Sequence, residues 1–229
     1  MRPHFFVTPC IFAAVLASPL SAQGGGMAGM NMDPTNKIVG SGKLPNGWMN
    51  RFDNATATLP QIELVQMGSA LHFRSGPAAI YYNTRDVAKG EYTVSGTFSQ
   101  KKTMQHEAYG LFVGGANLQD STQHYLYFVI RPSDGSILIS HRTSNGKPTA
   151  LVAMTPDEAV HKDDPTTGAA TNVLAIHVGR DSVHFYANGK EVRAFAKSAV
   201  DGAATEGQFG LRVNHNLDIT VEGFGINKR

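Results

Sequence analysis

The sequence predicts an all-β protein whose strands form two antiparallel sheets, packed face to face as a jelly-roll sandwich. Short runs rich in β-branched and aromatic residues recur along the chain, and Gly, Pro, Asn and Asp residues separate them. No window of about eleven or more residues shows the apolar spacing of an amphipathic helix. A sheet of many antiparallel strands without covering helices must close into a barrel or pack as two sheets to protect its edge strands. A two-sheet jelly roll fits a chain of this length.

The clearest local pattern is a hairpin over residues 183–195. Val183 and Phe185 alternate with His184 and Tyr186, which is the period of a strand with one buried face and one solvent-exposed face. Asn188-Gly189 follows, and this pair suits a two-residue type I′ turn because both central residues need a positive φ. A second β-type run comes directly after the turn, so the segment predicts two paired strands.

The same criteria place further strands along the chain. They are 61–65, 70–74, 79–83, 92–99, 108–114, 124–131, 137–142, 149–154, 172–178, 182–187, 191–195, 208–213 and 217–224. The best helical candidate is a single turn, with Thr155 as N-cap, Pro156 as the first helical residue and Glu158 as the third. A β-propeller would need repeated blades, and the sequence has no repeat of fixed period.

The N-terminal segment has the features of a secretory signal peptide. Arg2 gives a weakly basic start, a mostly apolar stretch follows, and Ser21-Ala22 offers small residues for cleavage. We therefore expect residues 1–22 to be removed and the protein to be exported to the periplasm or the extracellular space. A flexible Gly- and Met-rich linker, 23–43, and a β-sandwich domain, 44–227, complete the predicted organisation. A retained membrane anchor is the alternative, although proline interrupts the apolar run.

Composition narrows the classes of partner. Cys10 is the single cysteine and lies in the predicted signal peptide, so the mature protein would have no disulfide and no reactive thiol. Lys and Arg number 20 in the whole chain, Asp and Glu number 18, and no segment gathers the basic ones. This balance argues against nucleic acid and, after signal cleavage, against a membrane surface. The sequence leaves the oligomeric state open.

Three parts of the chain carry a resemblance to a known family. They are the hairpin 185–192, the strand Gly207-Gln208-Phe209-Gly210-Leu211, and the pair of runs 109–115 and 125–131. They resemble concanavalin A-like lectin/glucanase domains, including laminin-G-type modules and bacterial 3-keto-disaccharide hydrolase-like domains. The likeness covers most of residues 45–226. It implies a concanavalin A-like sandwich, and it transfers no activity because the shared motifs are structural.

The sequence gives little support for a pair of catalytic carboxylates. Glycosidases of that superfamily place acidic residues at close spacing on one strand, and this sequence lacks that pattern. The nearest pair, Asp218 and Glu222, would share a strand face about 13 Å apart. A retaining glycosidase needs about 5 to 5.5 Å between its carboxyl groups, and an inverting one about 6.5 to 9.5 Å. Glu107 is kept as an alternative catalytic residue that would pair with a carboxylate distant in the sequence.

Metal binding also has only weak candidates. No two histidines have a ligand spacing such as His-x-His or His-Glu-x-x-His. Asp120, Asp163 and Asp164 fall in predicted loops, where lectin-like domains sometimes hold calcium through carboxylates and carbonyls, so calcium is the one cofactor considered. The methionines of the linker could bind Cu(I) through their thioethers, but a linker without metal is the favoured interpretation.

The remaining candidate is a carbohydrate-binding surface. Sugar sites combine aromatic rings, which stack on C–H groups, with planar polar side chains that hydrogen-bond to hydroxyls. Leu126 and Phe128 alternate with Tyr125 and Tyr127, so the tyrosines are expected to face away from the core. We predict a ligand site on the concave sheet face that contains Tyr125, Tyr127, Arg131, His141, Arg142, Arg212, Asn214 and His215. An ordinary polar outer face is the alternative interpretation of these residues.

The sequence thus predicts a secreted, lectin-like domain that binds carbohydrate or a glycan without cleaving it. One alternative is an enzyme of the same fold that cleaves glycosidic bonds. Another is a structural domain that contacts a protein through its sheet face. Trp48, which precedes the first predicted strand, is expected to pack rather than to bind ligand.

Overall fold

The computed structural model describes residues 38–101, 107–144, 146–200 and 205–227. The predicted signal peptide and most of the predicted linker lie outside these residues. The described part of that linker, 38–43, contacts the sandwich, because the amide of Gly40 donates to the carbonyl oxygen of Pro60 at 2.8 Å. Within the described ranges, no helix combines the length and the apolar character needed to cross a membrane.

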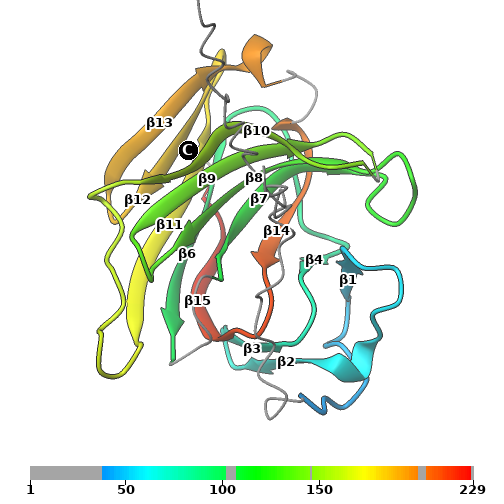
Figure 1. Cartoon of the computed structure of the whole chain (residues 1–229). Helices are drawn as coiled ribbons and strands as arrows, with labels where there is room; N and C mark the ends of the chain where they lie inside the picture. Colours follow the sequence, from blue (N-terminus) through cyan, green and yellow to red (C-terminus); the bar gives the residue numbers. More distant parts are fainter. Residues whose placement is uncertain (1–37, 102–106, 145, 201–204, 228–229) are drawn as a thin grey trace, which may run out of the picture. The chain divides into compact units, whose positions relative to one another are not determined.

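Two antiparallel sheets form the domain, as predicted (Figure 1). Sheet A has eight strands, β1 (Trp48–Phe52), β4 (Ala79–Asn83), β14 (Gly207–Val213), β7 (Tyr109–Ala116), β8 (His124–Arg131), β9 (Ser136–Arg142) and β10 (Thr149–Pro156) in spatial order, with β5 (Val87–Ala88) paired to β14. Sheet B has seven strands, β13 (Lys190–Ala196), β12 (Ser182–Ala187), β11 (Ala170–Val178), β6 (Tyr92–Gln100), β15 (Asp218–Asn227), β3 (Ala70–Ser75) and β2 (Ile62–Met67). Sheet B forms the outer layer of the curved sandwich and sheet A the inner layer (Figure 1).

The main core lies between the sheets, and aromatic pairs join them. Phe73 of sheet B meets Tyr81 of sheet A edge to face at 5.0 Å between ring centroids. Phe128 and Phe185 make a similar contact across the layers at 5.6 Å. Such pairs stabilise beyond the area they bury, by about 0.5–1.5 kcal/mol each. The alternation read from residues 124–131 is confirmed, since Leu126, Phe128 and Ile130 belong to this core.

All the predicted strands are present, but the structure has two that the sequence did not indicate. Strand β1 lacks the alternation of a half-buried strand, and it forms because β4 pairs with it along its whole length. Strand β5 is only a short pairing with β14. Trp48 of β1 packs on the core beside Phe224, with 6.2 Å between ring centroids, as expected.

The predicted helical turn at Thr155 is wrong. Thr155 and Pro156 instead end β10, where they pair with Ile137 and Ser136 of β9. Strand β10 is at the edge of sheet A, so the missing N–H of proline costs no hydrogen bond with a neighbouring strand. The chain then turns at Asp157, whose Oδ1 accepts the amide of Ala159 at 3.0 Å.

The predicted Asn-Gly turn is confirmed and also anchors a loop. Asn188 and Gly189 have φ values of 51° and 81°. The side chain of Asn188 accepts the amide of Val173 at 2.8 Å and donates to the carbonyl oxygen of Ala159 at 2.8 Å and to Oδ1 of Asn172 at 2.7 Å. One side chain therefore holds the β12–β13 hairpin, β11 and the 157–161 loop together.

We expect Asn188→Gly to lower the free energy of unfolding by roughly 3 kcal/mol, at about 1 kcal/mol for each of the three side-chain hydrogen bonds. Glycine accepts the positive φ, so the change isolates these bonds from backbone strain. Denaturant unfolding measures it. Asn117→Gly is the control, since Asn117 also has a positive φ, 52°, but its amide donates only to the side chain of Thr122 among the contacts resolved here. Equal losses in the two variants would contradict the anchoring role.

Candidate functional site

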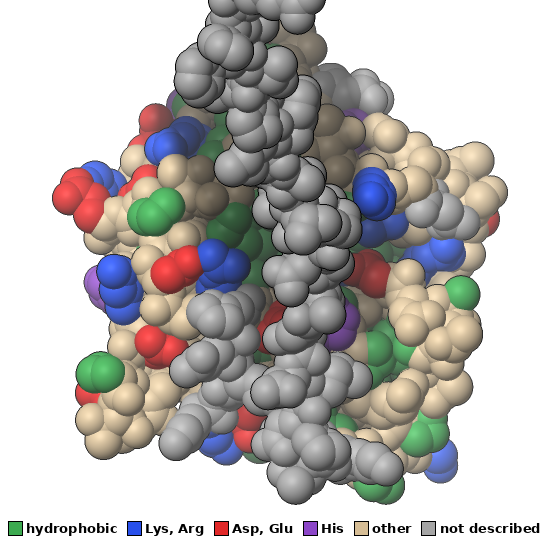
Figure 2. Space-filling model, viewed as in Figure 1, with side chains coloured by type: hydrophobic (Ala, Val, Ile, Leu, Met, Phe, Trp, Pro, Cys, Tyr) green, Lys and Arg blue, Asp and Glu red, His purple; other side chains and the backbone are tan. Residues whose placement is uncertain are grey.

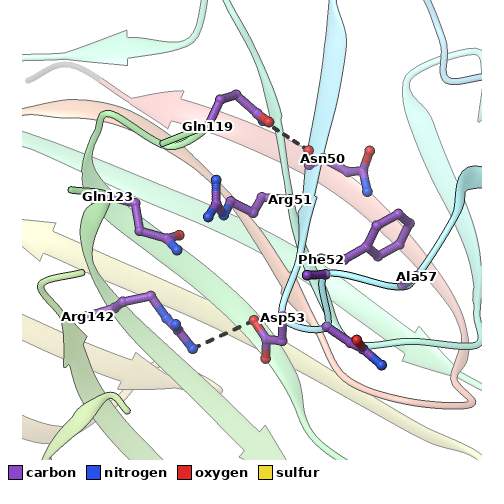
Figure 3. A pocket seen from close by; sticks show the side chains of 10 residues that line it. Asn50, Arg51, Phe52, Asp53, Ala57, Gln119, Gln123 and Arg142 are labelled. Carbon is purple, nitrogen blue, oxygen red and sulfur yellow. Dashed lines mark hydrogen bonds and ion pairs between the residues drawn. The ribbon is translucent and has the colours of Figure 1, made fainter. Parts of the chain in front are cut away.

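A pocket of about 450 Å³ opens on the side of sheet A that faces away from the core (Figure 3). Strand β1, the loop that follows it, the β7–β8 loop and the end of β9 form its walls. The lining residues are Asn50, Arg51, Phe52, Asp53, Asn54, Ala55, Ala57, Gln119, Gln123 and Arg142. Most of the polar ones end in amide or guanidinium groups, which are planar and offer several hydrogen bonds each.

Local hydrogen bonds shape the two loops of the pocket. In the loop after β1, Oδ1 of Asn54 accepts both the amide and the hydroxyl of Thr56, at 3.0 and 2.9 Å. In the β7–β8 loop, Oδ1 of Asp120 accepts the amide and hydroxyl of Thr122 at 2.7 and 2.6 Å. Gln119 then links the two walls, because its Nε2 donates to the carbonyl oxygen of Asn50 at 3.0 Å (Figure 3).

An ion pair between the buried Arg212 and the partly exposed Asp53 fixes the floor of the pocket to the sheet. Nη1 of Arg212, on β14, donates to Oδ1 of Asp53 at 2.8 Å, and Nη2 of Arg212 donates to Oδ2. Nη2 of Arg142 lies 3.8 Å from Oδ1 of the same carboxylate. The guanidinium of Arg212 also lies 5.8 Å from the centre of the Tyr127 ring, within range of a cation–π contact.

Burial and charge act in opposite directions on this pair. Burial alone would raise the pKa of Asp53, but the hydrogen bonds and charge of Arg212, with the charges of Arg142 and His215, outweigh it and hold that pKa below its usual range. For Arg212, burial disfavours the charged form, but the carboxylate of Asp53 more than compensates and raises the pKa of the guanidinium. Both groups are therefore charged near neutral pH.

The predicted aromatic residues lie beside the pocket in a second apolar cluster. Tyr125 is 1% exposed and Tyr127 8%, and their rings are 5.7 Å apart. Phe112 packs on Tyr125 at 5.3 Å. Gly210 makes room for Phe112, because a Cβ at that position would lie 2.5 Å from its ring. The tyrosines do face away from the main core, as predicted, but they are packed side chains and not an exposed platform.

The structure brings together four of the eight predicted ligand-binding residues. Tyr125 is paired with Arg142 across β8 and β9, and Tyr127 lies under Arg212. His141 is next to Arg142 on a regular strand, so its side chain is on the core-facing side.

The other predicted residues lie away from these four or form local contacts. Arg131 is at the opposite end of β8 from Tyr125, where its Nε donates to Asp134 at 3.0 Å. Asn214 is in the β14–β15 turn, and its amide donates to the carbonyl oxygen of Ala108 at 3.1 Å. His215 follows it, and its charge contributes to the low pKa of Asp53.

The residues that form most of the pocket were missed by sequence reasoning. Asn50, Arg51 and Asp53 come from β1 and its loop, and β1 itself was not predicted. Gln119 and Gln123 belong to the β7–β8 loop, for which only Asp120 had been considered. The one available signal was compositional, since 50–54 reads Asn-Arg-Phe-Asp-Asn and is the most polar stretch near an aromatic residue in that region.

The predicted catalytic and metal candidates have structural partners. Glu107 accepts the amide of His215 at 3.2 Å. Asp218 is on sheet B and contacts Nε2 of His72 at 2.8 Å. Asp120 caps its loop as described above, and Asp164 accepts the amides of Thr166 and Thr167 at 2.9 and 2.7 Å.

No metal cluster is found among the residues that the structure describes, where no three His, Cys, Asp or Glu side chains are placed to hold an ion. Asp163, the third calcium candidate, contacts the rest of the domain through its amide, which donates to the carbonyl oxygen of Pro132 at 3.2 Å. The linker methionines considered for Cu(I) lie outside the described residues.

Comparison with known proteins identifies the fold. No protein-family model and no curated protein sequence matches the chain. Among solved structures, the carbohydrate-binding module CBM66 from Bacillus subtilis is similar, with a TM-score of 0.53 and 13% identity over 83% of this chain and 99% of that one. A laminarinase from Flavobacterium sp. UMI-01 has a TM-score of 0.51 and 8% identity, over 79% of this chain and 93% of the other. The chain has a concanavalin A-like fold.

The neighbours of this concanavalin A-like domain differ in what their names describe. A β-glucanase from Bacillus licheniformis is similar over 82% of this chain and 95% of the glucanase, with a TM-score of 0.50 and 10% identity. Binding modules and glycan-cleaving enzymes thus share the architecture. At these identities the similarity shows the fold alone, and the function must be argued from the pocket.

We expect Asp53→Asn to destabilise the concanavalin A-like domain by about 2 kcal/mol, between the values typical of exposed and fully buried ion pairs. The physical reason is that the Arg212 side chain, 9% exposed, would keep its charge without a counter-ion. Denaturant unfolding at neutral pH measures the change. Glu158→Gln is the control, because Glu158 and Lys190 form an exposed pair whose loss should destabilise the domain far less than loss of the Asp53 carboxylate.

The same pair predicts a pH dependence. The pKa of Asp53 is lowered in the folded state, so its stabilisation is fully present above the usual aspartate range. It is lost as the pH falls through the lowered folded pKa. The difference in unfolding free energy between the wild type and Asp53→Asn should therefore be largest near neutral pH and should shrink in acid. A difference that stays constant from pH 7 to about pH 2.5 would refute this role of the carboxylate.

Proposed function

We propose that this domain binds carbohydrate, without cleaving it, in the pocket beside β1. The observation that carries the proposal is the convergence of amide and guanidinium side chains from three chain segments on one pocket. Planar groups of this kind donate and accept hydrogen bonds in fixed directions, which suits the arrayed hydroxyls of a sugar. A concave site with a few converging polar groups is also the usual form of a small-ligand site.

The electrostatics of Asp53 favour binding over hydrolysis. It is the one carboxylate among the lining residues of the pocket. A glycosidase needs a carboxylic acid with a raised pKa, paired with a second carboxylate at a defined distance. Asp53 has a lowered pKa, and both of its oxygens are engaged by Arg212. Its role is better explained as positioning the loop and Arg142 than as transferring a proton.

The buried tyrosines support the site from the side. Gln119 donates to the hydroxyl of Tyr82 at 2.8 Å, and Tyr82 belongs to the same apolar cluster as Tyr125 and Tyr127. The cluster therefore fixes a polar residue of the pocket wall. Pre-positioned side chains reduce the entropy that is lost when a ligand binds. Export, which the N-terminal sequence predicts, would bring such a domain into contact with extracellular or cell-wall glycans.

We expect saturable binding of a carbohydrate without turnover when purified protein is titrated with a broad oligosaccharide panel. Calorimetry measures binding, and a reducing-end assay measures cleavage. Arg51→Gln should weaken binding by about fivefold or more, since Arg51 lines the pocket. Arg180→Gln is the matched control, because Arg180 is 84% exposed in the loop between β11 and β12 of sheet B. Release of new reducing ends would overturn the non-catalytic assignment, and absence of binding across the panel would overturn the carbohydrate assignment.

A further inference from the structure

Two histidines lie side by side on the outer face of sheet B. His177 of β11 and His184 of β12 are direct cross-strand partners, and their ring centroids are 5.9 Å apart. They point away from the core, because Val178, Val183 and Phe185 at the alternate positions are fully buried. The side chain of His184 is 29% exposed, so a ligand from solvent can reach it. The spacing of the two histidines in the sequence matches no metal-binding motif, and only the pairing of β11 with β12 brings their rings together.

Hydrogen bonds at Nδ1 orient both rings. Nδ1 of His184 lies 2.7 Å from a carboxylate oxygen of Glu191 on β13. Since an ionised carboxylate only accepts, Nδ1 carries the proton and Nε2 carries the lone pair. Nδ1 of His177 lies 2.9 Å from the hydroxyl oxygen of Thr93 on β6, which can accept a proton in the same way. Histidines that bind metals usually have this arrangement, in which a carboxylate or another acceptor holds the second ring nitrogen.

The Nε2 atoms of the two rings lie near the same turn, which joins β11 to β12. Nε2 of His184 accepts the hydroxyl of Ser182 at 2.8 Å. A Cβ at Gly179 would lie 3.6 Å from Nε2 of His177 and 3.7 Å from Oγ of Ser182. Glycine has no such atom, so no side chain separates these groups at the turn. Two imidazoles that share one ion through bonds of about 2.0–2.1 Å have ring centres about 5–6 Å apart, and the observed separation is in this range.

The charges around the two rings do not oppose a cation. Glu191 places a carboxylate beside His184. Arg180 is in the adjoining turn, but its side chain is 84% exposed and lies 3.9 Å from Glu91. On the face seen in Figure 2, acidic and basic side chains are interspersed, so the described side chains there form no broad acidic patch that would gather cations without coordination. Affinity for an ion must therefore come from the ring nitrogens.

From this geometry we infer a binding site for one divalent transition-metal ion, held by Nε2 of His177 and Nε2 of His184, with water completing the coordination. The site is on sheet B, so it is independent of the pocket on sheet A and of the proposed carbohydrate binding. Imidazole nitrogen suits Cu²⁺, Ni²⁺ and Zn²⁺, whereas Ca²⁺ and Mg²⁺ prefer oxygen ligands. Two protein ligands make a smaller site than the three-ligand clusters that are absent among the described residues. Cu²⁺ binds such nitrogen sites most tightly of the three ions.

Calorimetric titration of the full chain with the chlorides of Cu²⁺, Ni²⁺, Zn²⁺, Ca²⁺ and Mg²⁺ tests the site. We expect saturable binding of the first three ions, tightest for Cu²⁺, and none of the last two. His177→Asn and His184→Asn should each weaken Cu²⁺ and Zn²⁺ binding by about tenfold or more, because each removes one of two ligands. His72→Asn is the matched control, since His72 is on the same face but contacts Asp218 at 2.8 Å instead of a second imidazole. It should change affinity by less than about twofold.

A second measurement locates the ion directly. In ¹H–¹⁵N spectra of the imidazole side chains, Zn²⁺ should shift the Nε2 resonances of His177 and His184 and leave those of His72 in place. Wild-type affinity in both ligand variants, or shifts confined to other histidines, would show that the ion binds elsewhere and would overturn the site. Loss in only one of the two variants would show binding by a single histidine and would overturn it as well, as would absence of binding by all three transition-metal ions. Sugar titrations test the pocket separately, so failure of the metal site and failure of carbohydrate binding are distinguishable.

Discussion

The ion pair between Asp53 and Arg212 is the interaction on which the pocket depends. It joins a loop near the start of the domain to a strand near its end, and nothing else resolved here fixes the Asp53 side chain so closely to the sheet. Since the Arg212 guanidinium is buried against Tyr127, the loop cannot leave without exposing a charge that has lost its counter-ion. The pair therefore fixes the loop after β1 close to Arg142 at the end of β9.

Two glycines allow the sheet to carry this arrangement. A Cβ at Gly110 would lie 2.0 Å from the carbonyl oxygen of Phe128, and one at Gly210 would lie 2.2 Å from that of Tyr81. Gly110 of β7 pairs with Arg212 of β14, and Gly210 of β14 pairs with Phe112 of β7. A large side chain thus stands beside a position with none, and at Gly210 the missing Cβ leaves room for the ring of Phe112. The Gly-x-x-Gly-Leu motif that resembles the lectin/glucanase family is in this way a requirement of the surface next to the pocket.

The sequence predicted the sheets well because burial imposes a two-residue period on every half-buried strand, as in 124–131 and 183–187. The same period placed Tyr125 and Tyr127 on the face away from the main core. This two-residue pattern could not predict the pocket, because the contact that fixes the pocket joins Asp53 and Arg212, which are 159 positions apart. It also missed β1, whose polar and apolar residues do not alternate, and with it Asn50 and Arg51. Only the paired strand β4 makes that segment a strand.

The two arginines near Asp53 differ in how completely their N–H groups are hydrogen-bonded. Arg212 has two strong hydrogen bonds to one carboxylate and an aromatic ring beneath it, so stability alone explains its burial. Arg142 has a long contact to the same carboxylate, and its Nε finds no acceptor among the described residues. A second arginine adds little to the pair once Asp53 is fully engaged, and leaving its buried Nε without an acceptor costs free energy. The two arginines beside Asp53 are therefore not equivalent, because Arg212 fixes the loop to the sheet and Arg142 contributes its charge to the wall of the pocket.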